Sequence, residues 1–200
     1  MTLTEPTIPH LELIRGGADV DLARAERAVA ELLDALGQDT TDEHMRETPR
    51  RVAAAFAEML TPRSFNLTTF PNDEGYDELV LARDIPFHSL CQHHLLPFKG
   101  VAHVGYLPGD RILGLSKFAR VVEMFARRPQ MQERLTVEIA DWLVDSLAPR
   151  GVGVVIEAEH LCMTLRGVQA AGATTSTSAL RGLLRERPQT RAEFLAGLER

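Results

Sequence analysis

The fold is decided by residues 77–108, which read DELVLARDIPFHSLCQHHLLPFKGVAHVGYLP. Apolar residues on either side of a central turn follow the extended pattern typical of β-strands. We therefore predict one strand over residues 78–88 and a second over residues 98–107. The turn between them, CQHHLLP, carries a cysteine and two histidines, so the tip of this hairpin would present metal-ligating side chains.

The chain after this hairpin is predicted to contain two helices, two strands and a closing helix. The first helix begins with Ser116 as its cap, and the second is ended by the Pro-Arg-Gly sequence at residues 149–151. Residues 152–163 and residues 173–180 have the composition of strands. Residues 190–198 form the closing helix.

The chain before the hairpin is predicted to be a flexible arm over residues 1–18 and a helical region over residues 19–75. In that region Asp19 caps one helix, and Thr48 caps a second helix that has proline in its first turn. Residues 76–200 form the main domain. Two helices followed by the order β-β-α-α-β-β predict an α+β fold, with an antiparallel sheet and helices on one of its faces.

Composition excludes several classes of protein. The chain has 200 residues, and its apolar content of 44% fits one globular domain. We expect no signal peptide and no membrane span, because the apolar runs are short. Two cysteines fit a reducing cytosol, so we expect a cytoplasmic protein. A formal net charge of −6 argues against nonspecific nucleic-acid binding.

A metal site is predicted from Cys91 and His94 in the turn and from Cys162 about seventy residues later. Two thiolates and one imidazole suit Zn²⁺, and three protein ligands leave a fourth tetrahedral position for water, as in catalytic zinc sites. On the predicted strand over residues 152–163, side chains two apart share a face, so His160 points the same way as Cys162. His93 and His160 would stand beside the metal as proton carriers.

Plainer interpretations of these residues stay open at this point. Two cysteines in an intracellular protein are often small core hydrophobes. A structural zinc would need a fourth protein ligand, and His10, His44, His88 or His103 could supply it, although none of them has a recognisable ligand spacing.

An anion site is predicted where Ser116, Lys117 and Arg120 open a helix. The amides and the dipole of a helix N-terminus favour anions, and Arg166 could bring a further guanidinium. The alternative is an ordinary capped helix with solvated basic residues.

A base-recognition site is predicted at the start of the following helix. The Glu133 carboxylate could accept two hydrogen bonds from an N–H edge such as that of guanine, and Gln132 could pair with a carbonyl. The commoner meaning of glutamate in a first helical turn is simple dipole compensation.

With these segments in order, the chain resembles the zinc-dependent type of GTP cyclohydrolase I from about residue 28 to its C-terminus. The resemblance rests on the segment of residues 77–108, on GLSKFARVVEMFARRPQMQERLT and EAEHLCMTLRGV, and on the later TSTSALRG. It implies the tunnelling fold, in which the sheets of several subunits join into a barrel, and a homodecamer with active sites at subunit interfaces.

The resemblance also implies a role for each candidate residue. Cys91, His94 and Cys162 match the Zn²⁺ ligands, and His93 and His160 match the catalytic histidines. Ser116 matches a triphosphate or ribose contact and is, with His93, our catalytic candidate for the later acid–base steps. Gln132 and Glu133 match the guanine contacts, and Lys117, Arg120 and Arg166 match triphosphate and ribose contacts. Arg51 matches an arginine contributed by a neighbouring subunit.

The implied reaction converts GTP and water to formate and 7,8-dihydroneopterin triphosphate, the first step of tetrahydrofolate and pterin biosynthesis. Zinc-bound water would attack purine C8 while His160 protonates N7, and ring opening, Amadori rearrangement and ring closure would follow. One departure is Gln92, where many members have glutamate. Two alternatives remain: a related enzyme that feeds 7-deazapurine synthesis or stops at the ring-opened intermediate, and a non-catalytic zinc-stabilised binding module.

Overall fold

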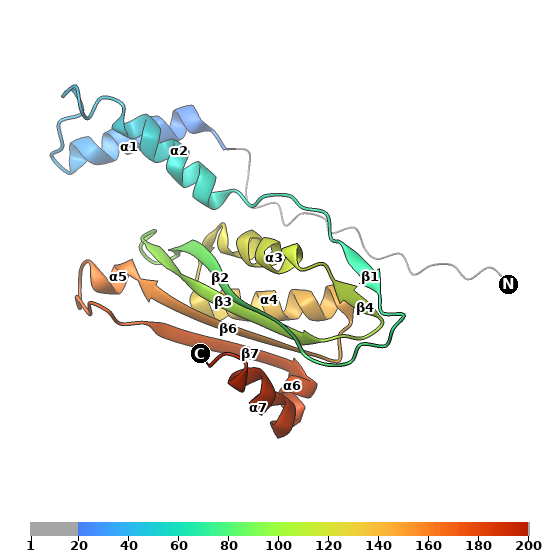
Figure 1. The fold of residues 1–200 in the computed structure, drawn as a ribbon. Coiled ribbons are helices and arrows are strands. Elements are labelled where there is room, and N and C mark those ends of the chain that lie inside the picture. Colours follow the sequence, from blue (N-terminus) through green and yellow to red (C-terminus); the bar gives the residue numbers. More distant parts are fainter. Residues whose placement is uncertain (1–19, 200) are drawn as a thin grey trace.

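A single curved five-stranded sheet organises the computed structural model, which describes residues 20–199 (Figure 1). The strands stand in the order β5-β2-β3-β6-β7. The long strands pair antiparallel, whereas the two-residue strand β5 pairs in parallel with the end of β2. Their bounds are β2 (Val80–Cys91), β3 (Pro97–Leu107), β5 (Pro129–Gln130), β6 (Gly151–His160) and β7 (Thr175–Gly182).

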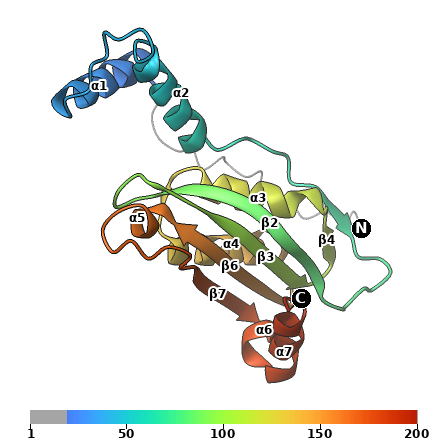
Figure 2. The ribbon, with the colours of Figure 1, turned by 60° about the vertical axis from the view of Figure 1, so that its left-hand side comes forward.

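One face of the sheet is covered by α3 (Ser116–Ala126) and α4 (Gln132–Leu147) (Figure 2). Both helices turn an apolar stripe toward the strands, and Phe118, Leu135 and Ile156 are among the fully buried side chains between the layers. This layer is the main hydrophobic core, and it leaves the ends of the strands free to carry polar side chains.

The opposite face is partly covered by α6 (Leu183–Glu186) and α7 (Pro188–Ala196) (Figure 1). Phe194 of α7 is completely buried there. Gly105 and Gly153 face each other across β3 and β6, and a Cβ on them would come to 3.0 Å and 2.8 Å, respectively, from the Phe194 ring. The absence of both side chains makes the space that this ring occupies.

The N-terminal helices α1 (Leu22–Ala35) and α2 (Thr48–Leu60) pack on each other and project away from the sheet (Figures 1 and 2). No residue of α1, which lies wholly within the described chain, is buried. The end of α2 is held to the body where the Arg127 guanidinium donates to the Glu58 carbonyl.

The predicted α+β class, the N-terminal helices and the order β-β-α-α-β-β are confirmed. The predicted layer of helices on one face is also present, with α6 and α7 added on the other. The sheet is mixed rather than purely antiparallel because of β5, a strand between α3 and α4 that the sequence did not predict. A two-residue strand is too short to show a period in the sequence.

The last part of the predicted helical region over residues 19–75 contains a strand, β1 (Thr69–Pro71), which pairs with β4 (Arg111–Leu113). The Arg111 guanidinium donates to the Thr69 hydroxyl over 2.7 Å and fastens this short pair. The segment before residue 76 therefore contacts the main domain. The division of the chain at residues 18 and 75 stays a prediction, and the arm over residues 1–18 lies outside the described residues.

The predicted N-terminal helix caps differ from those observed. Asp19 lies outside the described residues, and Asp21 caps α1 by accepting a 2.9 Å hydrogen bond from the Arg24 amide. Thr48 lies inside α2, after Glu47 at the cap position, because its hydroxyl turns to the sulfur of Met45.

At α3 the cap position belongs to Leu115, and Ser116 is the first helical residue. The Lys117 amide donates to the Gly114 carbonyl over 2.8 Å. The backbone of the preceding turn thus satisfies a first-turn amide, and the hydroxyl of Ser116 is not needed as a cap.

Among residues 20–199, no helix is long and apolar enough to cross a membrane.

Replacing Phe194 by alanine should lower the free energy of unfolding by roughly 3–5 kcal/mol, because a completely buried ring leaves a cavity between two glycines. Leu195→Ala is the matched control, since that side chain is 44% exposed and should change the free energy little. Denaturant titration at one protein concentration measures both. Equal losses in the two variants would contradict the placement of α7.

Candidate metal centre and active site

The candidate site lies at one end of the sheet, where three segments far apart in sequence are tied together. Cys91 is the last residue of β2 and pairs with Gln130 of β5, and the Gln92 amide donates to the Gln130 carbonyl over 2.9 Å. Since α4 begins two residues after Gln130, the parallel pairing of β5 with β2 places the start of α4 beside the metal-ligating turn. His160, the last residue of β6, faces Phe98 in the ladder beside the same turn.

Cys162 reaches the site by a route that the sequence did not predict. The predicted strand over residues 152–163 ends at His160, and Cys162 lies in the helical turn α5 (Leu161–Thr164). The prediction that it continues the strand face of His160 is wrong. Beyond Phe98 and Thr175, neither neighbouring strand offers a ladder partner, so the chain leaves the sheet and turns.

The three predicted metal ligands do come together. The ligand atoms of Cys91, His94 and Cys162 all lie within 4.8 Å of one another, and the Cys91 Sγ is 3.8 Å from the His94 Nδ1. Within residues 20–199 no further histidine, cysteine or carboxylate joins this group, so the alternative of a fourth protein ligand from His44, His88 or His103 finds no support there. His10 lies outside the described residues.

The donor set fits Zn²⁺ in type and spacing. A tetrahedral zinc with ordinary sulfur and nitrogen distances needs ligand atoms about 3.6–3.8 Å apart, close to the separation of Cys91 and His94. Burial raises the pKa of the Cys162 thiol, and the adjacent Cys91 raises it further, whereas Arg166 lowers it. Two sulfurs held this closely disfavour each other's thiolate form unless a cation lies between them. The cluster is therefore consistent with a zinc site.

Both predicted proton carriers stand beside the cluster. The His93 Nδ1 lies 3.9 Å from the Cys91 Sγ, and its ring meets that of His94 edge to face. His160 stacks on Phe98, with ring centroids 4.6 Å apart and planes inclined by 3°. Burial lowers the pKa of His160, which favours the neutral imidazole, and the Glu133 carboxylate partly offsets this. No pattern in the sequence indicated the role of Phe98, because a phenylalanine in a strand ordinarily belongs to the core.

Gln132 and Glu133, the predicted guanine contacts, begin α4 beside His160. Their side chains behave differently: Gln132 is only 2% exposed and accepts at 2.7 Å from the His160 ring, whereas Glu133 is exposed. Thr177, part of a segment taken from sequence as ordinary strand, contacts the Gln132 amide at 3.1 Å. The strand composition of residues 173–180 does not show which groups the Thr177 side chain would contact.

The start of α3 carries three predicted residues, Ser116, Lys117 and Arg120. It lies away from the metal end. The other end of α3 is the near one, because the Ser89 hydroxyl donates to the Ala126 carbonyl over 2.6 Å. The start follows β4, where the Leu113 amide donates to the Tyr106 hydroxyl at the far end of β3. At 1.5 Å per residue, the two ends of α3 stand roughly 15 Å apart.

These basic residues have other contacts within the chain. The Lys117 ammonium lies 5.9 Å from the centre of the Phe65 ring, and Arg120 pairs with Glu123 at 3.3 Å. Arg51 is exposed on the projecting helix α2, while Arg166 is exposed just after the Cys162 turn. One chain therefore brings Arg166 to the metal end, but not Ser116, Lys117 or Arg120.

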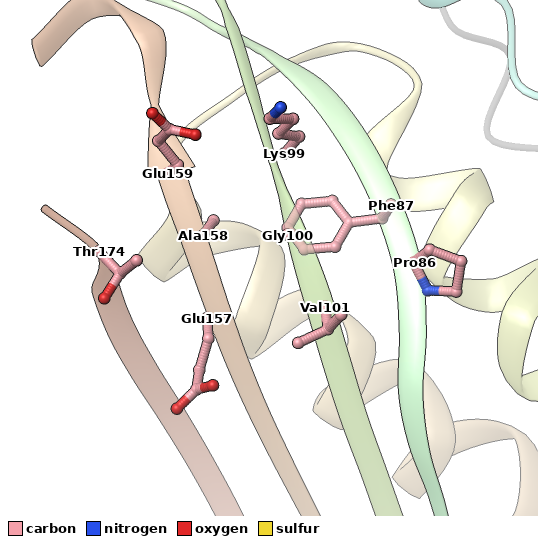
Figure 3. Close-up of a pocket in the computed structure, with 9 residues that line it drawn as sticks. All are labelled: Pro86, Phe87, Lys99, Gly100, Val101, Glu157, Ala158, Glu159 and Thr174. Atoms are coloured by element: carbon pink, nitrogen blue, oxygen red, sulfur yellow. The ribbon is translucent and has the colours of Figure 1, made fainter. Parts of the chain in front are cut away.

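A separate hollow of about 550 Å³ opens on the other face of the sheet (Figure 3). The hollow is lined by the side chains of Lys99 on β3 and of Glu157 and Glu159 on β6, and Thr174 lies at its edge (Figure 3). None of the predicted site residues lines it. Its side chains alternate with those that face the helices, so this hollow is distinct from the metal end.

Cys162→Ala should remove bound zinc, because Cys91 and His94 alone hold the ion poorly. Met163→Ala is the control from the same helical turn and should keep its zinc. Metal content after gel filtration, measured by plasma emission spectrometry, checks both. Stoichiometric zinc in purified Cys162→Ala would contradict this ligand set.

Comparison with known proteins agrees with this geometry. The family model described as GTP cyclohydrolase I matches residues 25–199. GTP cyclohydrolase 1 of Mycolicibacterium paratuberculosis is 56% identical over 88% of this chain and 88% of its own length. The protein of the same name from Aquifex aeolicus is 52% identical over 88% of this chain and 96% of its own.

Among solved structures, the crystal structure of the archaeosine synthase QueF-Like in the apo form is a partial likeness, with 19% identity and a TM-score of 0.44 over 52% of this chain and 93% of that one. The sequence relatives are far closer. Since the family model spans most of the residues and relatives more than half identical cover 88% of them, this chain belongs to the GTP cyclohydrolase I family.

Proposed function

We propose that this protein converts GTP and water to formate and 7,8-dihydroneopterin triphosphate. The observation that carries this proposal is the meeting of Cys91, His94 and Cys162 from two distant segments, with two further imidazoles beside the cluster. A structural zinc needs closed coordination, whereas hydrolysis needs an open position and proton carriers beside it. Family membership over residues 25–199 supports the same reaction.

Cys91, His94 and Cys162 would hold the Zn²⁺ ion. When bound with an open position, zinc supplies a water that is acidic enough to act as a nucleophile near neutral pH. The rest of the chemistry falls to the side chains of the chain.

His160 is placed to carry a proton to the purine: because burial favours its neutral form, the ring first takes up a proton and then gives it to guanine N7. Its ring is half-buried and held against Phe98, so it meets a flat substrate in a fixed orientation. A proton placed on guanine N7 draws electrons from C8 and makes that carbon open to attack by water. His93, which stands on the other side of Cys91, is our candidate for the later proton transfers of ribose opening and ring closure.

Glu133 is our candidate for reading guanine. Its carboxylate is exposed at the start of α4 and close enough to His160 to raise the pKa of that ring. Guanine is the base that offers two adjacent N–H donors, N1–H and the 2-amino group, and one carboxylate can accept both. Adenine has no such edge, so this contact selects the base.

A second chain would complete the site. Ser116, Lys117 and Arg120 stand at the far end of α3 in their own chain, so they could contact a triphosphate at the metal end only from a neighbouring subunit. The same holds for Arg51 on the projecting helix α2. We therefore propose a homo-oligomer with active sites at subunit interfaces, of which the family resemblance makes a homodecamer the expected form.

The test of the proposed reaction is to incubate the zinc-loaded protein with GTP and identify the products by mass spectrometry. We expect 7,8-dihydroneopterin triphosphate. Accumulation of a ring-opened formamide would favour an enzyme that stops early, and unchanged GTP would favour a zinc-stabilised binding module. Sedimentation velocity on the same sample tests the oligomer, and a monomer that is fully active would contradict the shared site.

Glu133→Gln should lower kcat/KM for GTP roughly ten- to hundred-fold, because an amide would turn a donor toward a donor and lose charge-assisted hydrogen bonds. The matched control is Glu157→Gln, since that exposed carboxylate lies on the other face of the sheet. Steady-state kinetics and zinc content measure both variants. A Glu133→Gln enzyme with wild-type kcat/KM would end the assignment of this residue to guanine.

Arg166→Ala should raise KM for GTP and reduce the preference for GTP over GMP, because the lost guanidinium would contact phosphate. Added salt should weaken GTP binding more in the wild type than in the variant, since ions screen the charge pair that the variant lacks. Arg185→Ala, an exposed arginine of α6, is the control. Steady-state kinetics with GTP and GMP at two ionic strengths measure these effects. An unchanged preference for GTP over GMP in Arg166→Ala would make this arginine a solvated surface residue.

A further inference from the structure

The side-chain amide of Gln132 has an orientation that cannot be reversed. Its Nε2 lies 3.0 Å from the Ile156 carbonyl oxygen and 2.9 Å from the Thr175 carbonyl oxygen. Backbone carbonyls only accept hydrogen bonds, so the nitrogen of the amide must face them. The usual uncertainty about which end of a glutamine is oxygen is removed here by the two strands themselves.

A closed chain of hydroxyl groups supports the same orientation. The Thr136 hydroxyl donates to the backbone carbonyl of Gln132 over 2.7 Å. It therefore accepts from the Thr177 hydroxyl, also at 2.7 Å. The hydroxyl hydrogen of Thr177 is then already used in this bond. Thr177 can therefore only accept a hydrogen bond from the Gln132 Nε2, which lies 3.1 Å away. Gln132 and Thr136 are only 2% and 1% exposed, so water does not compete for these bonds.

The remaining polar atom of the side chain, Oε1, lies 2.7 Å from the His160 Nε2. An amide oxygen can only accept, so the ring nitrogen opposite it must carry a hydrogen. Phe98 fixes the plane of the same ring by stacking on it. The ring therefore has neither a free rotation nor a free choice of tautomer.

We propose that Gln132 is a positioning residue that holds the neutral His160 ring in the Nε2–H tautomer, with Nδ1 as its unprotonated nitrogen. This inference rests on the proposed function only in giving His160 its task as proton carrier. Gln132 then acts on the substrate through His160, and guanine recognition falls to its neighbour Glu133, whose side chain is exposed. Every polar atom of the Gln132 side chain is already engaged within the protein.

The tautomer can be read without any substrate. Protein labelled with ¹⁵N-histidine is sedimented at about pH 8.5, where an ordinary imidazole is neutral, and examined by solid-state NMR. The His160 signals are assigned as those missing from His160→Ala. We expect the protonated nitrogen of wild-type His160 to be Nε2. An Nδ1–H ring overturns the proposal, whatever the activity of the enzyme.

Variants then test whether Gln132 is the cause. Gln132→Met keeps the length of the side chain and removes its amide, so the ring should become a mixture of tautomers. We expect kcat to fall roughly ten- to hundred-fold, with KM for GTP and zinc content changed less than two-fold. Thr177→Val removes one partner of the amide but leaves both carbonyls, and should keep the Nε2–H form and most of kcat.

Other results are equally decisive. A Gln132→Met variant whose KM rises while the tautomer and kcat stay unchanged would make Gln132 a guanine contact and overturn the proposal, as would unchanged kinetics. If Gln132→Met does not fold, the wild-type tautomer still decides, because it needs no variant of Gln132. Failure of the proposed function is separate: it would appear as a wild type that leaves GTP intact, with the tautomer still measurable.

Discussion

The antiparallel ladder through β2, β3 and β6 fixes where Phe98 and His160 stand in the candidate site and where the metal-ligating turn begins. Leu90 pairs with Pro97 and Phe98 pairs with His160, so the end of β2 and the end of β6 lie on either side of the start of β3. A slip of one residue would send His160 to the opposite face and part it from Phe98 and Gln132. The buried apolar side chains of the same strands resist that slip, since they would have to leave the core.

The two-residue strand β5 extends this constraint to the helices. It holds Gln130 against Cys91, and α4 starts immediately afterwards. The positions of the predicted metal ligand Cys91, the predicted proton carrier His160 and the start of α4 are thus set by backbone hydrogen bonds rather than by flexible side chains. Fixed positions of this kind let binding and proton transfer occur without reordering the site at the moment of reaction.

Much of the fold could be predicted because its signals are local. Strand alternation on both sides of CQHHLLP located the hairpin, and helical spacing located α3 and α4. Residue type and spacing predicted Cys91, His94 and Cys162 as the ligand set, the resemblance to a family agreed, and the observed cluster is consistent with it. The helical turn at Cys162 could not be predicted, because it follows from the loss of ladder partners on both neighbouring strands, which no local pattern records.

The same limit applies to the polar contacts. The sequence predicted Gln132 as a guanine contact, and that role stays a prediction. The four contacts of its side chain are with the His160 ring, two backbone carbonyls and one hydroxyl, all on β6 and β7. Likewise, the residues Ser116, Lys117 and Arg120 predicted an anion site but not the direction of α3, which takes them away from the candidate metal site of their own chain. Long-range packing decides both.

The most direct measurement for the whole account follows the carbon atom that leaves the purine. Zinc-loaded protein is given GTP labelled with ¹³C at C8, and the label is followed by ¹³C NMR. Hydrolysis at the metal end predicts that the label appears as free formate, in equal amount to the pterin formed. Label that remains in a nucleotide, or in a ring product, while zinc is bound would contradict the reaction proposed for this site.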